Sequence, residues 1–442
     1  MRIFGSKHIT SFQIIILGFA GVILAGSLLL MLPFASVAPG CAGFADTLFT
    51  ATSAVCVTGL IVQDTATYWT LFGQFIIILL IQIGGLGVVT IAVSIVTISG
   101  RKIGLMQRST LQDAISAQKV GGIVRLTSFI FKTTFLIEGI GAAVMYPVFC
   151  RDFGPVKGLW YAVFHSISAF CNAGFDLMGV NAKFSSVTAY YNEPLIAIPI
   201  MLLIITGGIG FLTWEDIKTH RLRFRRYRMQ SRVILITTAA LILLPALYFF
   251  LAEYGSFPVG DRLLLSFFQS VTPRTAGFNT ADLTAMSETG ILIMTLLMLI
   301  GGSPGSTAGG MKTTTLAVLL ASAVAVFKRD GDAHLLGRRI EDGAIRQAGA
   351  ILIMYMVLFL TGGMIISRVE GLPILTCLFE TGSAIGTVGL TLGITPSLSL
   401  ISRTILGLLM FFGRVGGLTL IFATFSGRRQ GARLPMEKIT VG

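Results

Sequence analysis

Four short segments, each closing on a glycine, recur at regular intervals in otherwise apolar sequence. They occupy residues 54–59, 169–174, 273–277 and 384–389 and are called strips 1 to 4 below; they read Ala-Val-Cys-Val-Thr-Gly, Ala-Phe-Cys-Asn-Ala-Gly, Pro-Arg-Thr-Ala-Gly and Ala-Ile-Gly-Thr-Val-Gly. Successive closing glycines are 115, 103 and 112 residues apart, which indicates an internal repeat. Non-helical backbone is tolerated at membrane depth only where it is buried in protein or lines a watery path. The strips therefore predict one pathway built by four repeats.

The composition is that of a membrane protein. Only 12% of the 442 residues are charged, whereas about a quarter are charged in a typical soluble chain. Apolar stretches lie near residues 11–34, 71–99, 123–149, 194–212, 233–251, 290–302, 348–366 and 404–425. A span needs about 20 residues, and we interpret the sixth stretch as a broken span that resumes at 313–327. The prediction is an all-α polytopic membrane protein with eight transmembrane spans.

The basic residues give the orientation. The net charge is +13, and Lys and Arg gather near residues 2–7, 101–125, 221–232, 328–346 and 428–438, while the loops between them are acidic. By the positive-inside rule the basic segments are cytoplasmic, which places both termini inside, as an even number of spans requires. The basic run 221–226 is also compatible with nucleic-acid binding, but no soluble binding fold accompanies it. We expect no nucleic-acid partner.

Each repeat is predicted to consist of a span, a re-entrant half-helix, a strip and a second span. The repeats cover residues 1–100, 101–226, 227–332 and 333–442, and the half-helices cover 45–54, 160–169, 263–271 and 374–383. A half-helix that ends at the membrane centre directs a partial negative charge there, which favours a cation. Carbonyl groups of the strips can replace the water shell of that cation. The sequence predicts a pseudo-four-fold pore with a cation selectivity filter.

The candidate filter residues are those nearest each closing glycine. They are Cys56, Val57, Thr58, Gly59, Cys171, Asn172, Ala173, Gly174, Thr275, Ala276, Gly277, Gly386, Thr387, Val388 and Gly389. Asp64, Asp176 and Asp282 follow strips 1 to 3 and are candidates for an acidic outer vestibule that concentrates cations, although single acidic residues are common in outer loops. We expect K⁺ to be held by filter carbonyls.

Glycine pairs recur in the second span of each repeat. They are Gly84–Gly85, Gly207–Gly208, Gly301–Gly302 and Gly416–Gly417. Close packing of helices through small residues explains any one pair, but four pairs at similar offsets favour the repeat.

Two features occur only once and predict a gate. The run from Gly301 to Lys312 has too much Gly and Pro for an ordinary span, so we interpret Gly301, Gly302, Ser303, Gly305, Ser306, Thr307, Gly309 and Gly310 as an intramembrane gate loop. A packing kink without a gating role is the alternative. Arg414 is a charge inside the last span and is expected to bind loop carbonyls or to repel cations, the alternative being a structural role.

Other polar residues in apolar context are expected to lie behind the filter. Glu138, His165 and Glu380 are predicted to be buried and hydrogen-bonded, and Arg274 to point into protein because a pathway-facing Arg would oppose cations. The five cysteines have no metal-ligand spacing, and a disulfide between Cys41 and Cys150 stays open beside burial as small hydrophobes.

Taken together, the strips, the glycine run and Arg414 resemble the KtrB/TrkH/HKT superfamily of potassium transporters, its KtrB branch most closely. The resemblance covers essentially the whole chain. It rests on Ala-Val-Cys-Val-Thr-Gly-Leu, Phe-Cys-Asn-Ala-Gly-Phe, Thr-Pro-Arg-Thr-Ala-Gly-Phe-Asn-Thr, Gly-Thr-Val-Gly-Leu-Thr and Gly-Gly-Ser-Pro-Gly-Ser-Thr-Ala-Gly-Gly-Met-Lys.

The resemblance implies further properties. It implies potassium uptake across the plasma membrane, commonly sodium-dependent, by a homodimer that contacts its partner through a tail like residues 434–439. It also implies a cytosolic KtrA-type RCK ring that binds ATP or ADP, so this chain would carry no organic cofactor. A TrkH-type Na⁺/K⁺ transporter and an ion-coupled carrier of another solute are the alternatives. Motifs of membrane-embedded enzymes are lacking, so we expect no enzymatic activity.

Overall fold

The structure is a computed structural model, and it describes residues 10–37, 40–98, 105–115, 123–221, 223–417 and 419. The helices of its first half are α1 (Ser11–Leu30), α2 (Phe44–Val55), α3 (Thr65–Tyr68), α4 (Leu71–Leu86), α5 (Val88–Ile98), α6 (Leu105–Ile115), α7 (Ile123–Phe153), α8 (Pro155–Phe170), α9 (Pro194–Gly208) and α10 (Phe211–His220). Those of the second half are α11 (Met229–Tyr248), α12 (Val259–Val271), α13 (Glu288–Leu299), α14 (Thr313–Phe327), α15 (Asp342–Glu370), α16 (Ile374–Gly386) and α17 (Leu400–Val415). A small antiparallel hairpin pairs β1 (His334–Leu335) with β2 (Arg338–Arg339).

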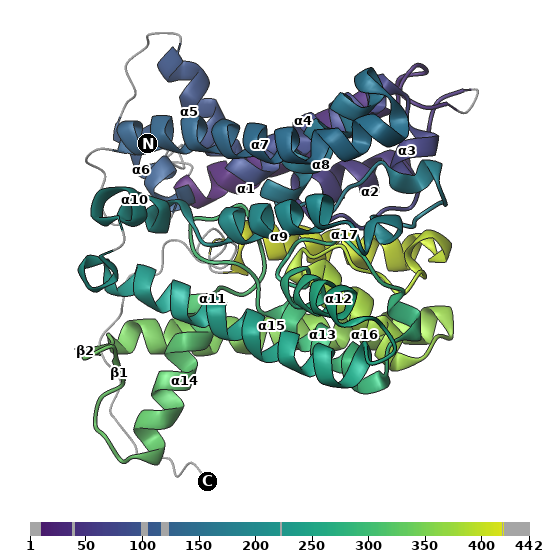
Figure 1. The fold of residues 1–442 in the computed structure, drawn as a ribbon. Helices are drawn as coiled ribbons and strands as arrows, with labels where there is room; N and C mark the ends of the chain where they lie inside the picture. The colour runs from purple at the N-terminus through teal and green to yellow at the C-terminus, as the bar shows by residue number, and fades with distance from the viewer. Residues whose placement is uncertain are drawn as a thin grey trace.

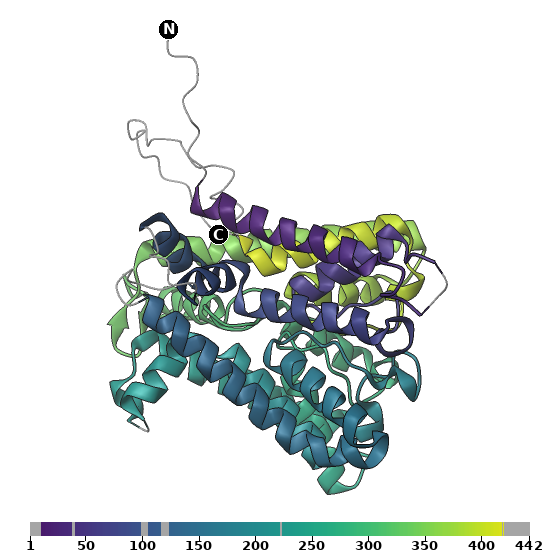
Figure 2. The ribbon, with the colours of Figure 1, turned by 90° about the horizontal axis from the view of Figure 1, so that it is seen from above.

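Long apolar helices enclose an interior of short helices and loops. The helices α1, α7, α11 and α15 run lengthwise around a region of short helices and loops (Figures 1 and 2). Large hydrophobic side chains are exposed on their outer faces, among them Leu28, Leu136, Leu244 and Ile353. Because lipid is the solvent around a membrane protein, this arrangement suits a multi-pass membrane protein.

The number of spans is not settled by helix length alone. Four helices are long and apolar enough to cross a membrane, and the bent pairs α4–α5 and α9–α10 raise the number to six within the described residues. Eight crossings require that α13 with α14, and also α17, count as spans. That expectation stays a prediction.

Two of the predicted spans are bent, and a glycine stands at each bend. Residues 71–99 and 194–212 are each predicted to form one span, and in the structure each is bent: α4 turns by 94° into α5, and α9 by 96° into α10. Gly87 and Gly210 stand at the two breaks with φ of 88° and 89°, and Gly416 ends α17 with φ of 87°. Side chains disfavour such backbone, so glycine permits the turn.

Helices are present at all four predicted half-helices, as α2, α8, α12 and α16; α2, α8 and α16 end within the first residues of their strips, and α12 ends one residue short of strip 3. Helix α8 begins earlier than expected, at Pro155, because proline at the first helical position fits a helix start. The inner faces of these helices carry buried hydroxyl and small side chains. They therefore pack closely and leave the strips at the centre of the molecule.

The basic segments lie at one end of the molecule. In Figure 1 the hairpin β1–β2, α14 and α10 lie at the end opposite α3. The hairpin carries Arg338 and Arg339, and the connection from α10 to α11 carries Arg223, Arg225 and Arg226. This common end is the one that the positive-inside rule assigns to the cytoplasm.

All five cysteines are free, so Cys41 and Cys150 are not bonded in this structure.

Candidate functional site

The closing glycine of each strip packs against the next strip. A Cβ on Gly59 would collide with the carbonyl oxygen of Ala173, one on Gly174 with that of Ala276, one on Gly277 with that of Val388, and one on Gly389 with that of Thr58. The contacts run from strip 1 to 2, 3 and 4 and back to strip 1. The four strips therefore form a closed ring, and a side chain at any of its glycines would force the ring apart.

The strips share one backbone conformation. The residue two positions before each closing glycine is left-handed, with φ of 50° at Val57, 59° at Asn172, 66° at Thr275 and 51° at Thr387. The closing glycines themselves have φ of 91°, 69°, 77° and 95° in chain order. Non-glycine residues seldom adopt left-handed backbone. Its recurrence at the same position in four strips of different sequence shows that the ring imposes it.

The ring presents carbonyl oxygens that no group in the described part of the chain binds. Within the described part of the chain, no hydrogen bond ends on the carbonyls of residues 57–59, 172–174, 275–277 or 387–389. The strips are fully or almost fully buried, and the hydroxyls of Thr58 and Thr387 also have no partner there. Buried carbonyls normally find a hydrogen-bond donor. Unpaired oxygens gathered in one ring are suited to a cation.

One hydroxyl side chain at the end of each half-helix holds its strip. Ser53 Oγ accepts from the Gly59 N–H at 3.0 Å, and Ser383 Oγ accepts from the Gly389 N–H at 3.0 Å. In the middle repeats the hydroxyl donates instead, Ser168 to the Phe175 carbonyl at 2.7 Å and Thr272 to the Phe278 carbonyl at 2.5 Å. These four residues were missed by the sequence analysis, although a Ser or Thr stands five or six positions before every closing glycine.

A cavity of about 270 Å³ lies on the outer side of the ring. All four closing glycines line it, together with Asp176 and Asp282. Burial raises the pKa of Asp176 to about 7, so its charge is incomplete at neutral pH. Asp64 was expected in this vestibule but is not among its lining residues: its carboxylate caps α3 through the Thr67 N–H at 2.9 Å.

The run from residue 300 to 312 lies on the inner side of the ring as a loop between α13 and α14. Thr307 Oγ1 donates to the Phe170 carbonyl at 3.0 Å and to Asn172 Oδ1 at 3.1 Å, which ties the loop to strip 2. Gly309 packs against the side chain of Thr387 in strip 4. The loop therefore contacts two strips on opposite sides of the ring.

The loop is anchored to the breaks in the neighbouring spans. Ser303 N–H donates to the Gly208 carbonyl at 2.9 Å, and Gly310 N–H donates to the Gly413 carbonyl at 3.2 Å. The Phe211 N–H at the start of α10 donates to the Gly305 carbonyl at 2.8 Å. The loop also pairs with itself, since the Gly301 N–H donates to the Met311 carbonyl at 2.7 Å, and the neighbouring spans supply further hydrogen bonds to its irregular backbone.

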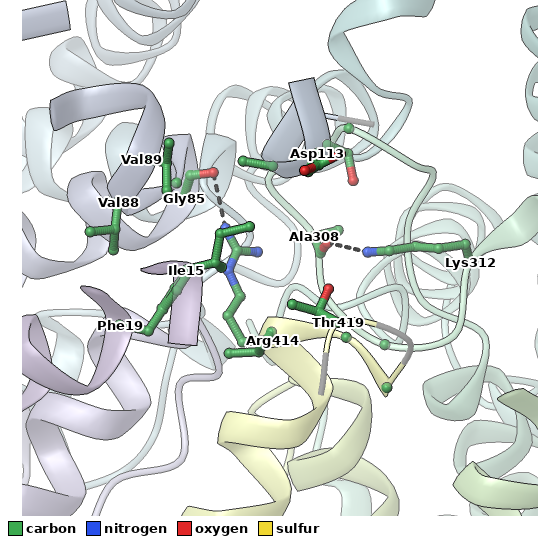
Figure 3. Close-up of a pocket in the computed structure, with 18 of the residues that line it drawn as sticks. Ile15, Phe19, Gly85, Val88, Val89, Asp113, Ala308, Lys312, Arg414 and Thr419 are labelled. Atoms are coloured by element: carbon green, nitrogen blue, oxygen red, sulfur yellow. Dashed lines mark hydrogen bonds between the residues drawn. The ribbon is translucent and has the colours of Figure 1, made fainter. Parts of the chain in front are cut away.

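Arg414 bridges the loop and the first repeat. Its guanidinium donates to the carbonyls of Thr307, Gly84 and Gly85, the last at 3.0 Å (Figure 3). It lines an inner cavity of about 260 Å³ together with Lys312, whose Nζ donates to the Ala308 carbonyl at 2.8 Å. One side chain thus binds elements that are over 200 residues apart in the chain.

The structure corrects the register of the last glycine pair. Gly84 packs on the Val55 carbonyl, Gly207 on the Phe170 carbonyl and Gly413 on the Ile385 carbonyl, each four residues before a closing glycine. The equivalent of Gly84–Gly85 is therefore Gly413–Arg414, and not Gly416–Gly417. Gly416 instead matches the break glycines 87 and 210. The spacing Gly-Gly-Leu-Gly, Gly-Gly-Ile-Gly and Gly-Arg-Val-Gly carried this signal in the sequence.

The remaining polar residues lie behind the ring, as expected. Arg274 is buried and donates to Thr238 Oγ1 on α11 at 3.3 Å. Glu138 on α7 accepts from Gln82 Nε2 at 3.1 Å, and Gln82 Oε1 in turn is 3.6 Å from the Cys171 sulfur of strip 2. His165 and Glu380 are fully buried in the half-helices α8 and α16.

Comparison with known proteins identifies relatives over nearly the whole chain. Residues 7–430 match the model of the TrkH family, described as cation transport protein. The chain is 40% identical to the potassium/sodium uptake protein NtpJ of Enterococcus hirae, over 99% of this chain and 98% of that protein. It is 39% identical to the Ktr system potassium uptake protein B of Bacillus subtilis, over 97% of this chain and 96% of that protein.

A solved structure has the same fold. The crystal structure of the potassium transporter TrkH from Vibrio parahaemolyticus superimposes with a TM-score of 0.74 and covers 96% of this chain and 87% of that one. Its sequence identity is 18%, so this likeness speaks for the fold alone.

Proposed function

Because the chain belongs to the TrkH family of cation transport proteins, we propose that it is the pore-forming membrane subunit of a potassium uptake system. Relatives at 39% and 40% identity are named potassium uptake proteins, and they align with almost every residue of this chain. The family consists of transporters, so no catalytic chemistry is assigned to the molecule. K⁺ is the transported ion in this proposal.

The observation that carries the proposal is the ring of unpaired carbonyls. Potassium is a hard cation that loses its water shell only where oxygens replace it, and carbonyl dipoles do this without trapping the ion by a full charge. The C-terminal ends of α2, α8, α12 and α16 add partial negative charge at the same place. The four strips are thus a selectivity filter with pseudo-four-fold symmetry.

The loop from residue 300 to 312 is the gate in this proposal. It lies against the inner side of the ring and contacts strips 2 and 4, so an ion leaving the ring must pass it. Arg414 adds a positive charge at the same level and binds the Thr307 carbonyl of the loop. The proposed closed state is held by these bonds and opens when they break.

The assembly is also part of the proposal. We take the working unit to be a homodimer in the plasma membrane with eight spans per chain, both termini inside, and a cytosolic KtrA-type ring that senses ATP or ADP. The exposed arginines between α10 and α11 offer that ring a docking surface. Sodium dependence is supported by the name of the Enterococcus relative, a potassium/sodium uptake protein. Residues 434–439, assigned above to the dimer contact, lie outside the described residues.

The test is cation flux in proteoliposomes with Gly59, Gly174, Gly277 and Gly389 each replaced by Ser. A Cβ at any of these sites meets a carbonyl of the next strip, so the ring must widen and its preference for K⁺ over Na⁺ must fall. Gly371→Ser is the matched control, because Gly371 is also left-handed, with φ of 69°, but a Cβ there meets nothing within 4 Å. If K⁺ preference survived all four filter substitutions, the assignment would be wrong.

A further inference from the structure

Two opposite strips carry a fully buried polar side chain at the same position of the half-helix. His165 stands nine residues before Gly174, and Glu380 stands nine residues before Gly389. Since the ring runs in the order of strips 1, 2, 3 and 4, strips 2 and 4 face each other across its centre. Two buried polar side chains at matching positions of opposite repeats suggest a common role.

Both side chains accept a hydrogen bond from the backbone N–H three residues after the closing glycine of their own strip. The Leu177 N–H, three residues after Gly174, donates to His165 Nε2 at 3.3 Å. The Leu392 N–H, three residues after Gly389, donates to Glu380 Oε1 at 3.1 Å. A side chain of each half-helix is thus hydrogen-bonded to the segment that directly follows its own strip.

The two acceptors are themselves held firmly. His165 Nδ1 lies 2.7 Å from the Tyr161 carbonyl, which makes Nδ1 the donor and leaves Nε2 free to accept, and its ring lies 5.1 Å from that of Phe149. Glu380 uses both carboxylate oxygens: Thr391 Oγ1 donates to Oε1 at 2.5 Å and Thr395 Oγ1 donates to Oε2 at 2.8 Å. All three donors to Glu380 belong to the segment that follows strip 4.

Strips 1 and 3 lack this arrangement. The matching position of repeat 1 is Thr50, whose hydroxyl donates to the Asp46 carbonyl of its own helix at 2.8 Å. In repeat 3 the residue three positions before the strip-holding Thr272 is Gln269, which is also buried, but its Nε2 contacts the sulfurs of Met286 and Met294 at 3.9 and 3.5 Å and not the backbone that follows strip 3. Anchoring from behind is therefore confined, among the described residues, to one opposite pair of strips.

We propose that His165 and Glu380 are positioning residues that fix the distance between strips 2 and 4 across the ion path and thereby set ion selectivity. The inference rests on the filter function proposed above. A ring of carbonyls discriminates K⁺ from the smaller Na⁺ only if its walls cannot close in on the smaller ion, and two opposite anchored strips supply that resistance. Hydrogen bonds to a carboxylate are stronger than those between neutral groups, so Glu380 is the stiffer of the two anchors.

The test compares ⁸⁶Rb⁺ and ²²Na⁺ uptake by purified protein in proteoliposomes. Glu380→Gln keeps one acceptor oxygen and replaces the other by an NH₂ group, which cannot accept a hydrogen bond, so the Leu392 N–H and the Thr395 hydroxyl can no longer both donate to the side chain. We expect its Rb⁺ to Na⁺ uptake ratio to fall about tenfold, the effect of one lost bond to a charged group. Thr50→Val is the matched control at the same position of repeat 1, and its ratio should stay at the wild-type value.

A pair of milder substitutions at Thr395 controls for misfolding. Thr395→Val removes one bond to Glu380 Oε2 without touching the strip, and we expect its uptake ratio to fall by a smaller factor. Thr395→Ser keeps the hydroxyl and should restore the wild-type ratio. A role in stability alone would lower the yield of folded protein and leave the ratio unchanged for every variant.

Gly389→Ser in the same assay separates the two proposals. If it lowers the ratio while Glu380→Gln and Thr395→Val do not, the anchoring inference is overturned and the filter stands. If Gly389→Ser leaves the ratio unchanged as well, the filter function itself is overturned and the inference falls with it.

Discussion

Arg414 occupies a position that is glycine in the first two repeats. Gly85 and Gly208 stand at the matching positions of α4 and α9, where a Cβ on Gly85 would lie 2.6 Å from the Cys171 sulfur. The fourth repeat replaces that glycine by a long charged side chain, which reaches across to Gly84, Gly85 and Thr307. A planar guanidinium can serve several carbonyls at once because its five N–H donors point in fixed directions.

Replacing Arg414 by Lys should loosen the gate. An ammonium group keeps the charge, but it cannot donate to the Thr307 and Gly85 carbonyls at the same time as the planar guanidinium does. The loop therefore loses one hydrogen bond. We expect K⁺ uptake without any partner subunit to rise about tenfold, on the scale of one lost hydrogen bond to a charged group, while K⁺ preference over Na⁺ is kept. Uptake by proteoliposomes measures both quantities.

Arg368→Lys, at an exposed site near the end of α15, is the control for this substitution and should change neither quantity. A wild-type rate for Arg414→Lys would contradict a role of the guanidinium in holding the loop.

At the scale of elements, the loop from residue 300 to 312 depends on the broken spans around it. It accepts or donates hydrogen bonds at Gly207 and Gly208 on α9, at Phe211 on α10 and at Gly413 on α17. In a continuous helix these carbonyls would accept hydrogen bonds from N–H groups of the same helix and would not be free to bind the loop. The bend at Gly210 is thus part of how the hydrogen bonds of an irregular loop are satisfied at membrane depth.

Removing Gly305–Gly310 should raise K⁺ uptake and weaken nucleotide control by the partner ring. The deletion removes the hydrogen bonds to Phe170, Asn172 and Arg414 and the contact of Gly309 with Thr387, so the part of the loop that contacts strips 2 and 4 is lost. The milder Thr307→Val removes only the two side-chain bonds and should raise uptake by a smaller factor. Uptake and regulation that stay unchanged in both variants would leave the loop as a packing kink.

The half-helices could be predicted because their apolar runs are too short to span and end at polar strips, and α2 and α16 indeed begin and end close to the expected residues. The bends of α4 and α9 could not, because the sequence stays apolar through Gly87 and Gly210 and hydropathy does not report direction. The register of Gly413 was missed for a similar reason. A pair of adjacent glycines at 416–417 resembled the other pairs more than the single Gly413 did, and only the packing on Ile385 distinguishes them.

At the scale of the molecule, the first and last repeats must meet for the ring to close. Arg403 on α17 donates to Asp46 on α2 at 3.0 Å, and Gln63 donates to the other oxygen of Asp46 at 2.9 Å. Both charged side chains are about three-quarters buried. This contact joins repeats 1 and 4 across 357 residues of sequence, beside the strip contact of Gly389 with Thr58.

Breaking this closing contact should lower stability. Asp46→Asn and Arg403→Gln should each cost about 1 to 2 kcal/mol, since each leaves a largely buried charge without its partner. The double variant should cost less than the sum, because the second substitution removes a charge that is already unpaired. Thermal unfolding in detergent measures the three losses, and strictly additive losses would show that the pair is not coupled.

The central claim is that cations occupy the ring of strip carbonyls. A crystal of the protein grown in Rb⁺, measured at the rubidium absorption edge, reports ion positions directly. We predict anomalous density at the centre of the ring, within bonding distance of carbonyls from residues 57–59, 172–174, 275–277 and 387–389. Density confined to other parts of the molecule, with none in the ring, would contradict the account.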